Sequence, residues 1–257
     1  MNARKINKIF SWIYPVLSLL VVAGVWAILH AKIGSEYLFP SLGSTLERIV
    51  TLVKAKETWI AIGGTMGRAV WSFLVALALA IVFGIASYLL PPLRKVLSPV
   101  VAIMRSAPTV ALMVILAFIV KSPKESPLIV SVTVIFPMLY ASTLGALKQI
   151  PRSLIEMSVV YEVKPIKRIF GLYVPSVVPT MIAEAGAALS FNVKLIVSAE
   201  ILAYTAKSLG GLIQTANAYS DMSGLFALTV ISIIIATALE QIVRLISYLL
   251  TKRGGGV

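Results

Sequence analysis

The sequence predicts an all-α protein that crosses a membrane about six times. Of its 257 residues, 59% are hydrophobic and only 13% are charged, whereas about one quarter of an ordinary soluble domain is charged. The apolar runs are continuous rather than alternating, which favours membrane helices over membrane strands. The formal net charge of +13 arises from basic residues near the ends of these runs, where they set orientation and meet anionic lipid.

Six apolar segments are separated by polar ones. The first, 10–29, follows a basic start but exceeds the roughly 7–15 residues of a signal-peptide core, so we interpret it as a retained helix. The other spans are expected at 69–93, at 97–120 with Arg105 inside it, at 127–147 with Pro137 inside it, at 172–203 and at 224–250. Two smaller features are predicted as well, namely an amphipathic surface helix at 44–53 and a bend at Gly210-Gly211.

The positive charges predict the orientation of these segments. Lysines and arginines are more frequent in the loops that would face the cytoplasm if the N-terminus lay inside. Five of the eight opposing basic residues, Lys32, Arg48, Lys54, Lys56 and Arg68, fall in one longer loop, where the bias is weaker evidence. The positive-inside rule therefore predicts that both termini are cytoplasmic.

The densest cluster of charges lies in 145–175, which this orientation places in the cytoplasm. Pro151 suits the first position of a helix, and apolar residues recur after it at helical spacing. Pro165 disfavours α conformation at Lys164 and can open a second helix. We therefore expect two short helices with a bend between Glu162 and Lys164, whose apolar face meets either lipid headgroups or a partner protein.

The fifth segment carries a lysine, Lys194, near its middle. A lysine there costs roughly 2.5–3.5 kcal/mol on insertion scales, so it should face a cavity or a partner. At about 100° per residue, a stripe of small and polar residues combines Ala183, Ala187, Ser190, Lys194 and Ser198, while Phe191, Leu195 and Leu202 point elsewhere. This stripe favours a helix that lines a solute path. The alternative is a packing face on which Glu200 or Glu240 neutralises Lys194.

Motifs for covalent chemistry are absent from the sequence. It has no G-x-x-x-x-G-K-[ST] phosphate loop, no group of residues at metal-ligand spacing, no cysteine, and one histidine, His30, at the end of an apolar run. Basic patches interleaved with aromatic residues, which single-stranded nucleic acid needs, are also missing. We therefore expect a non-enzymatic protein that transports, conducts or anchors, without a cofactor or metal of its own and without nucleic acid.

The 145–175 stretch resembles the cytoplasmic motif E-A-A-x3-G-x9-I-x-L-P of permease subunits of type I ABC importers. The motif positions are taken, without gaps, by Glu156-Met157-Ser158, Glu162, Leu172 and Val174-Pro175. Further resemblance, covering about 40–245, lies in Arg105-Ser106-Ala107-Pro108, in Phe136-Pro137 with Ser142-Thr143-Leu144-Gly145, and in KLIVSAEIL from Lys194 with LGGLI from Leu209. The last two runs are similar to the nitrate/sulfonate/taurine branch.

The resemblance implies an inner-membrane permease that forms a solute path, here for a small organic or inorganic anion. It implies one domain over 1–257, with a tail and first helix at 1–35, a core at 60–250 and a coupling region at 148–175. The residues expected to dock on the ATPase are Glu156, Met157, Ser158, Tyr161, Glu162, Lys164 and Pro175. The residues expected to line the solute path are Ala187, Ser190, Lys194 and Ser198. The implied partners are two ATPase subunits that bind ATP and magnesium, a second copy of the chain in a homodimer, and an extracytoplasmic solute-binding protein.

The sequence departs from the family motif at the Ala-Ala pair and at the glycine. Met157-Ser158 replaces Ala-Ala, and Glu162 stands where the family has a glycine at the bend. If that bend needs positive φ, a glutamate there costs on the order of 1 kcal/mol; otherwise Pro165 does part of the turning, or Glu162 contacts a basic residue of the ATPase.

Other functions stay open. A stand-alone secondary transporter or channel would predict internal repeats, which we do not find. A membrane scaffold would leave Lys194 unexplained.

Overall fold

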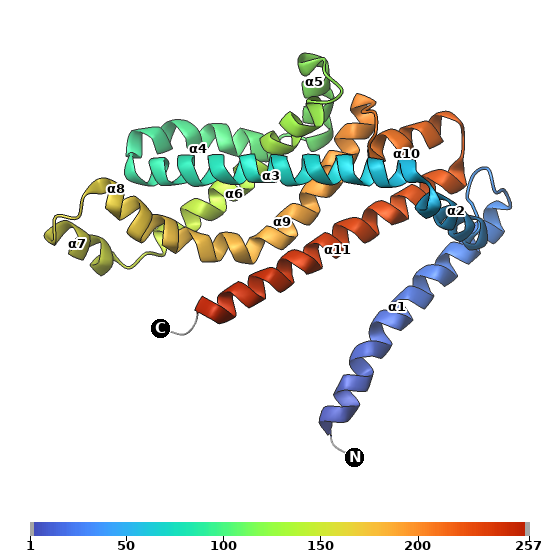
Figure 1. Cartoon of the computed structure of the whole chain (residues 1–257), viewed down its shortest axis with the longest axis horizontal. Helices are drawn as coiled ribbons and strands as arrows, with labels where there is room; N and C mark the ends of the chain where they lie inside the picture. Colours follow the sequence, from blue (N-terminus) through green and yellow to red (C-terminus); the bar gives the residue numbers. More distant parts are fainter. Residues whose placement is uncertain (1–2, 255–257) are drawn as a thin grey trace. The chain divides into compact units, whose positions relative to one another are not determined.

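The computed structural model describes the backbone of residues 3–254 and the side chains of Tyr14 and of residues 16–249. Within residues 3–254 the chain forms helices and no strand, as predicted (Figure 1). The helices are α1 (Ala3–Ile33), α2 (Leu42–Lys54), α3 (Lys56–Leu89), α4 (Pro91–Ser106), α5 (Thr109–Val120), α6 (Ser126–Lys148), α7 (Arg152–Val160), α8 (Pro165–Arg168), α9 (Val174–Ala203), α10 (Leu209–Ala218) and α11 (Met222–Gly254), with a π-helical turn, Ile169–Tyr173, between α8 and α9.

The helices provide five or six membrane crossings. Five segments of the described part are long and apolar enough to span, namely Val16–Ile33, Lys56–Leu89, Ser126–Lys148, Pro165–Ala203 and Met222–Leu249. A sixth crossing arises if α4 and α5 form one broken span. The prediction of a polytopic helical protein with about six spans is therefore confirmed, and so is the short helix α2 at the predicted place.

The continuous third span predicted at 97–120 is wrong. The chain breaks between α4 and α5, whose axes differ by 104°. Ala107 is extended, with φ −66° and ψ 136°, because the ring of Pro108 disfavours α conformation in the residue before it. Arg105 lies exposed in the last turn of α4, where a cation suits the free carbonyl groups of the helix end.

The bend predicted at Gly210-Gly211 is also wrong. Both glycines lie in the first turn of α10 and continue the helix. A Cβ atom on Gly210 would stand 2.6 Å from the carbonyl oxygen of Val197, and one on Gly211 would collide with the carbonyl oxygen of Thr205. Glycine is needed here because two backbone segments approach closely, not because the chain turns.

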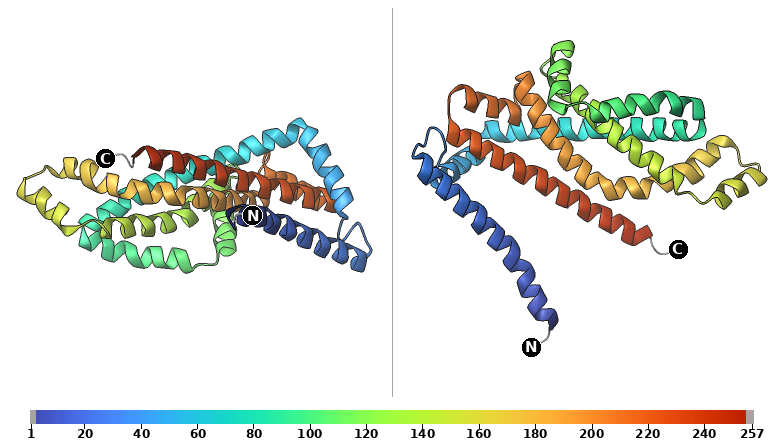
Figure 2. Two further views of the ribbon diagram at one scale, coloured as in Figure 1. Left: turned by 90° about the horizontal axis from the view of Figure 1, so that it is seen from below. Right: turned by 180° about the vertical axis from the view of Figure 1, so that it is seen from behind.

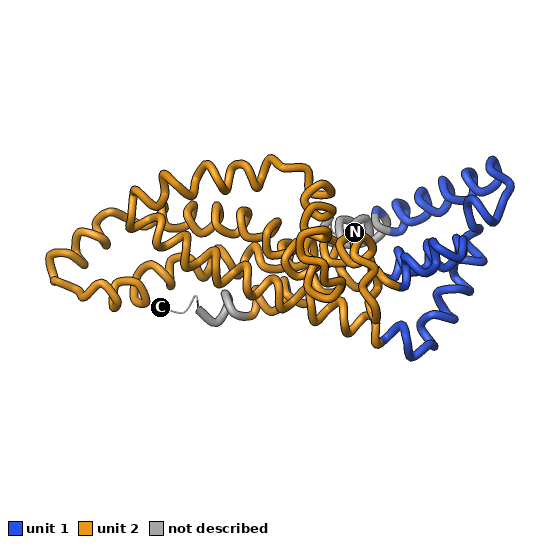
Figure 3. The backbone as a smooth tube through the Cα atoms, turned by 90° about the horizontal axis from the view of Figure 1, so that it is seen from above, with its two compact units in different colours: residues 1–59, 212–231 blue, residues 60–211, 232–257 orange. Residues whose placement is uncertain are grey.

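The chain divides into two compact units, which are described separately (Figure 3). Unit 1 comprises residues 1–59 and 212–231, and unit 2 comprises residues 60–211 and 232–257. In unit 1 the ring of Trp26 lies 5.4 Å from that of Phe39 and 5.3 Å from that of Phe226, and Arg48 pairs with Asp221 at 2.6 Å. Burial raises the pKa of Asp221, but hydrogen bonds from the start of α11 and from Arg48 outweigh it, so the pKa lies below its usual value.

The core of unit 2 includes the extensive packing of α6 against α9. A buried polar cluster joins α3 to both of them. Asn192 on α9 donates to the carbonyl oxygen of Ala69 at 2.7 Å and to the hydroxyl of Ser72 at 3.0 Å, and its amide oxygen accepts from Ser131 on α6. All four side chains are buried. Because these polar groups satisfy one another, three helices can meet in an apolar surrounding at little cost.

A buried ion pair binds α3, α9 and α10 at the other end of α9. Glu200 is fully buried, and one of its carboxylate oxygens lies 2.7 Å from Arg68. Its other oxygen accepts from the hydroxyl of Thr65 at 2.9 Å and from the backbone N–H of Gly210 at 3.2 Å. Thr65 in turn accepts from the N–H of Leu209 at 2.9 Å. Thr65 and Arg68 precede the predicted span 69–93, and their contacts with Glu200 show that this polar part of α3 packs inside unit 2.

Replacing Glu200 with glutamine should destabilise unit 2 markedly. The change leaves the largely buried charge of Arg68 without a counterion, at a cost of about 3–5 kcal/mol. The matched control is Glu240→Gln, which breaks a more exposed pair with Arg244 worth about 0–1 kcal/mol. Thermal unfolding in detergent measures both variants, and equal melting temperatures for them would contradict the assigned role of Glu200.

Candidate functional site

The α7–α8 hairpin forms one end of unit 2, as both views in Figure 2 show. The two short helices predicted in the 145–175 stretch are confirmed. Pro165 begins α8 as expected, after an extended Lys164 with φ −52° and ψ 139°. The turn between the helices contains Glu162 in the left-handed region, with φ 50°.

This turn is a Schellman motif, which is a common way to end a helix. The N–H of Val163 donates to the carbonyl oxygen of Ser158 at 3.0 Å, and the N–H of Glu162 donates to that of Val159 at 2.9 Å. These are the two bonds that define the motif, and they require a left-handed residue at the position of Glu162. Glycine serves best there because it lacks a Cβ atom. The bend is therefore not rebuilt around Pro165, and the cost of about 1 kcal/mol for a side chain at positive φ applies.

Arg168 holds the hairpin together from α8. One terminal nitrogen of its guanidinium lies 3.1 Å from the carbonyl oxygen of Ser158 and 3.3 Å from that of Val163. The side chain thus reinforces the carbonyl group that already closes the Schellman motif. The sequence showed Arg168 only as one of five basic residues in the stretch, and spacing does not distinguish it from the others.

Most of the predicted docking residues lie on the outer surface of the hairpin. Glu156, Met157, Tyr161, Glu162 and Lys164 are exposed. Their surface includes the large apolar residues Val159, Val160, Ile166 and Phe170, which are more than half exposed.

Two of the predicted docking residues are placed differently. Ser158 is half-buried, and its hydroxyl donates to the carbonyl oxygen of Ile155 at 2.6 Å. Pro175 lies in the first turn of α9, outside the hairpin. The structure therefore gathers five of the seven residues on one exposed element.

The exposed stripe on α9 differs from the predicted one in its composition. Ser190 is only 4% exposed and turns toward the neighbouring helices. Phe191 and Leu202, which were expected elsewhere, are exposed at 42% and 39%. The α9 stripe consists of Ala183, Ala187, Phe191, Lys194, Ser198 and Leu202. The polarity of Ser190 suggested the wrong side of the helix, because small serine side chains pack readily between helices.

Lys194 is exposed on this stripe, and neither carboxylate proposed to neutralise it does so. Glu200 pairs with Arg68, and Glu240 pairs with Arg244 at 2.8 Å across one helical turn. Among the described side chains, no carboxylate lies within ion-pair distance of Lys194. Lys194 therefore lacks the counterion that the packing explanation requires. Its ammonium group can interact with a solute or a partner on the exposed face of α9.

The hairpin and the stripe belong to one continuous helical element. The helix from Pro165 through the π-helical turn to Ala203 counts as a single 39-residue span. The only departure from α-helix in it is the turn Ile169–Tyr173, where Tyr173 is buried against the core. The hairpin is therefore connected to Lys194 by continuous helix, without an intervening loop, although Pro179 lies inside α9.

These features define a class of protein. A polytopic helical membrane protein is typical of a transport permease when it has an exposed hairpin that continues into a helix with an unpaired charge. The family model of the binding-protein-dependent transport system inner membrane component matches residues 76–253. The chain belongs to this family and is the permease subunit of an ABC importer, a multi-pass protein of the inner membrane.

Two named relatives agree with this assignment. The chain is 22% identical over 237 residues to the taurine transport system permease protein TauC of Escherichia coli (strain K12), covering 90% of this chain and 86% of that protein. It is 24% identical over 218 residues to the nitrate import permease protein NrtB of Synechocystis sp. (strain ATCC 27184 / PCC 6803 / Kazusa). This match covers 79% of this chain and 78% of that protein.

Two solved transporters share the fold. A chain of the MetNI methionine ABC transporter in an inward-facing conformation superposes with a TM-score of 0.57 at 22% identity, covering 72% of this chain and 95% of that one. A chain of a bacterial ABC transporter for the import of alginate superposes with a TM-score of 0.67 at 16% identity, covering 96% and 99%. At these identities the likeness concerns the fold alone.

Replacing Glu162 with glycine should tighten the hairpin turn. The change removes the penalty of a Cβ atom at positive φ, about 1 kcal/mol, and should slow hydrogen exchange of the Glu162 and Val163 amides about fivefold. The control is Glu156→Gly, which places a glycine inside α7 and should speed exchange by a similar factor. Faster exchange in the Glu162 variant would contradict the Schellman assignment.

Proposed function

We propose that this permease imports a small anion and is driven through the α7–α8 hairpin by two ATPase subunits. The observation that carries the proposal is the exposed hairpin, which a side-chain clamp stiffens and a continuous helix joins to Lys194. A stand-alone transporter or channel does not require an exposed hairpin of this kind. A permease that is driven by a separate ATPase requires an exposed element on which the ATPase can bind.

The coupling step follows from the mechanical connection. Closure of the ATPase subunits on ATP moves the two bound hairpins together. Because Arg168 and the Schellman turn make the hairpin rigid, the movement passes to α9 instead of being absorbed in a loop. ATP thereby shifts the population between inward-open and outward-open states, since the ATPase has different affinities for them. ATP and magnesium are bound by the ATPase, and this chain performs no hydrolysis and holds no cofactor.

The arrangement in the membrane follows from the distribution of charge. The hairpin must face the cytoplasm to meet an ATPase, which is consistent with cytoplasmic N- and C-termini under the positive-inside rule. The solute path forms where the α9 stripe of one chain faces that of a second copy in a homodimer. An extracytoplasmic binding protein delivers the solute to the outer face, in keeping with the description of the family.

The charge on the α9 stripe supports an anion as the solute. Lys194 places a cation about two thirds of the way along α9, on an exposed face without a counterion among the described residues. In a low-dielectric path such a charge attracts anions and repels cations. The two named relatives transport taurine, which carries a sulfonate, and nitrate. Ala187 and Ser198 keep the path open beside Lys194 because their side chains are small.

Reversing the charge of Glu156 should uncouple the complex. Glu156→Lys changes an exposed residue of the hairpin and should lower solute-stimulated ATP hydrolysis at least about tenfold without affecting insertion, because like charges opposed at an interface cost several kcal/mol. The assay uses the purified complex with its ATPase. The matched control is Glu47→Lys, an exposed position on α2. Normal coupled activity in the Glu156 variant would exclude docking through this surface.

Removing the charge of Lys194 should alter transport more than assembly. Lys194→Ala is expected to reduce anion uptake into proteoliposomes about tenfold or more at unchanged yield of the complex, because the cation in the path is lost. Lys194→Arg keeps the charge and should retain most of the uptake. If both variants transport like the wild type, Lys194 does not line the path. ATP-independent uptake would instead favour a secondary transporter.

A further inference from the structure

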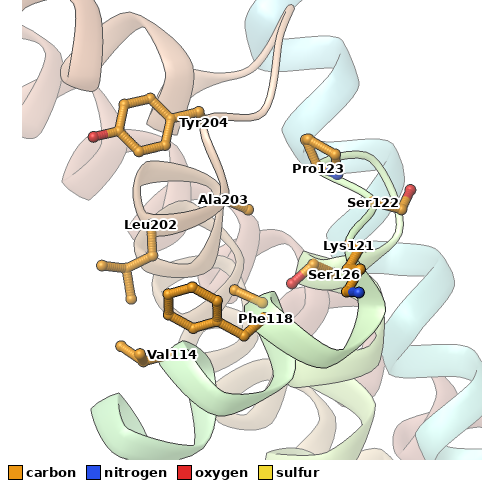
Figure 4. A pocket seen from close by; sticks show the side chains of 10 residues that line it. Val114, Phe118, Lys121, Ser122, Pro123, Ser126, Leu202, Ala203 and Tyr204 are labelled. Atoms are coloured by element: carbon orange, nitrogen blue, oxygen red, sulfur yellow. The ribbon is translucent and has the colours of Figure 1, made fainter.

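A cavity of about 560 Å³ lies between α5, the turn that joins α5 to α6, and the end of α9 (Figure 4). Its lining residues all belong to unit 2, and they are Val114, Ala117, Phe118, Lys121, Ser122, Pro123, Ser126, Leu202, Ala203 and Tyr204. The volume is within the range of small-molecule sites, roughly 300–1,000 Å³. The hairpin and the hydrogen-bond clusters described above lie elsewhere and do not use it.

The wall of the cavity is apolar along α5 and at the end of α9, and polar at the turn that joins α5 to α6. Val114, Phe118 and Leu202 supply apolar side chains. Lys121, the left-handed C-cap of α5, follows Val114 and Phe118 at helical spacing; it is exposed and has no ion pair within the described part of the chain. An exposed ammonium group beside an apolar wall can pair with the charged end of an organic anion.

A second polar group beside the lysine lacks a partner. Ser126 is 2% exposed and begins α6, and its hydroxyl oxygen is shielded from solvent without a hydrogen-bond partner among the described residues. In Figure 4 its side chain points from the start of α6 toward the side of the cavity where Phe118 lies. A buried hydroxyl without a partner costs on the order of 1–3 kcal/mol, which a bound acceptor would relieve.

The cavity also continues the face of the proposed solute path. Leu202 belongs both to the cavity wall and to the exposed α9 stripe. Lys194 precedes Leu202 by eight residues, which is about 12 Å along the helix axis. Under the proposed orientation, the cavity lies at the outer end of the stripe, where a solute released by a binding protein would arrive. Two lysines then succeed each other from the outside inward along one face.

We propose that this cavity is an outer-side binding site for an organic anion, which it holds before the anion reaches Lys194. The anionic group pairs with the ammonium group of Lys121. Rotation of the shielded Ser126 side chain into the cavity lets its hydroxyl donate a hydrogen bond to the same group. The carbon chain of the solute packs on Val114, Phe118 and Leu202. An inorganic anion would leave the apolar wall unused, so the site selects solutes that combine both features. This proposal rests on the proposed function and narrows its solute class.

Direct binding to the purified permease–ATPase complex without ATP tests the proposal. The probes are butane-1-sulfonate, nitrate and butylammonium, and binding is measured by equilibrium dialysis. Butane-1-sulfonate should bind at least about tenfold more tightly than either of the others, because only it matches both the cation and the apolar wall. Equal binding of all three probes, or tighter binding of butylammonium, would overturn the proposal.

Variants assign the binding to this cavity. Lys121→Gln should weaken butane-1-sulfonate binding about tenfold and Ser126→Ala several-fold. The matched control is Lys124→Gln, which removes a lysine of the same turn that does not line the cavity and should change nothing. Lys121→Arg should restore most of the binding, which shows that the fold is intact. Unchanged binding in Lys121→Gln would place the anion elsewhere.

The outcome separates this inference from the proposed function. A complex that couples solute to ATP hydrolysis but binds no butane-1-sulfonate through Lys121 overturns the cavity site and leaves the importer mechanism standing. A chain that binds no ATPase overturns the proposed function, and dialysis of the chain alone then decides whether the cavity still binds an anion. Loss of uptake in Lys194→Ala with normal probe binding would be the expected result for two successive sites.

Discussion

The arrangement of unit 2 depends on the ion pair between Arg68 and Glu200. A carboxylate that is fully buried in a membrane helix is tolerable only with a counterion and further donors. Here Arg68, Thr65 and the start of α10 supply them at once. Satisfying this one charge fixes the part of α3 around Arg68 and the first turn of α10 against α9. Gly210 follows from the same constraint, because the backbone of α10 must approach α9 closely there for the hydrogen bond to form.

With its far end anchored, α9 can act as a lever. Its near end continues through a π-helical turn into the α7–α8 hairpin, so no loop separates the exposed surface of the hairpin from Lys194. The hairpin is stiff for a local reason, since Arg168 and two backbone hydrogen bonds share the carbonyl groups at the end of α7. Glu162 accepts conformational strain at this turn. A side chain in a glycine position costs stability but places an exposed carboxylate at the turn of the hairpin.

Much of the fold and part of the site could be predicted from the sequence. The spans follow from apolar length, and the hairpin follows from Pro151 and Pro165, because proline acts on its immediate neighbours alone. The break at Pro108 was predictable on the same grounds, but the apolar residues on either side of Arg105-Ser106-Ala107-Pro108 favoured one continuous span. The stripe on α9 was misplaced because periodicity gives the spacing of a face and not its direction. Ser190 and Phe191 are adjacent, and only neighbouring helices decide which of them is buried.

The sequence alone determined the membrane class, the number of crossings, the hairpin and the lysine within α9, since these depend on local conformation and on the cost of placing a residue in lipid. The tertiary structure decided which carboxylate pairs with which cation, since Glu200 pairs with Arg68 and not with Lys194. It also decided that Arg168 stabilises the hairpin, and that Lys121 and Ser126 line one cavity. The physical reason is distance along the chain. Arg68 and Glu200 are brought together only when whole helices pack, and no pattern within either helix specifies that partner.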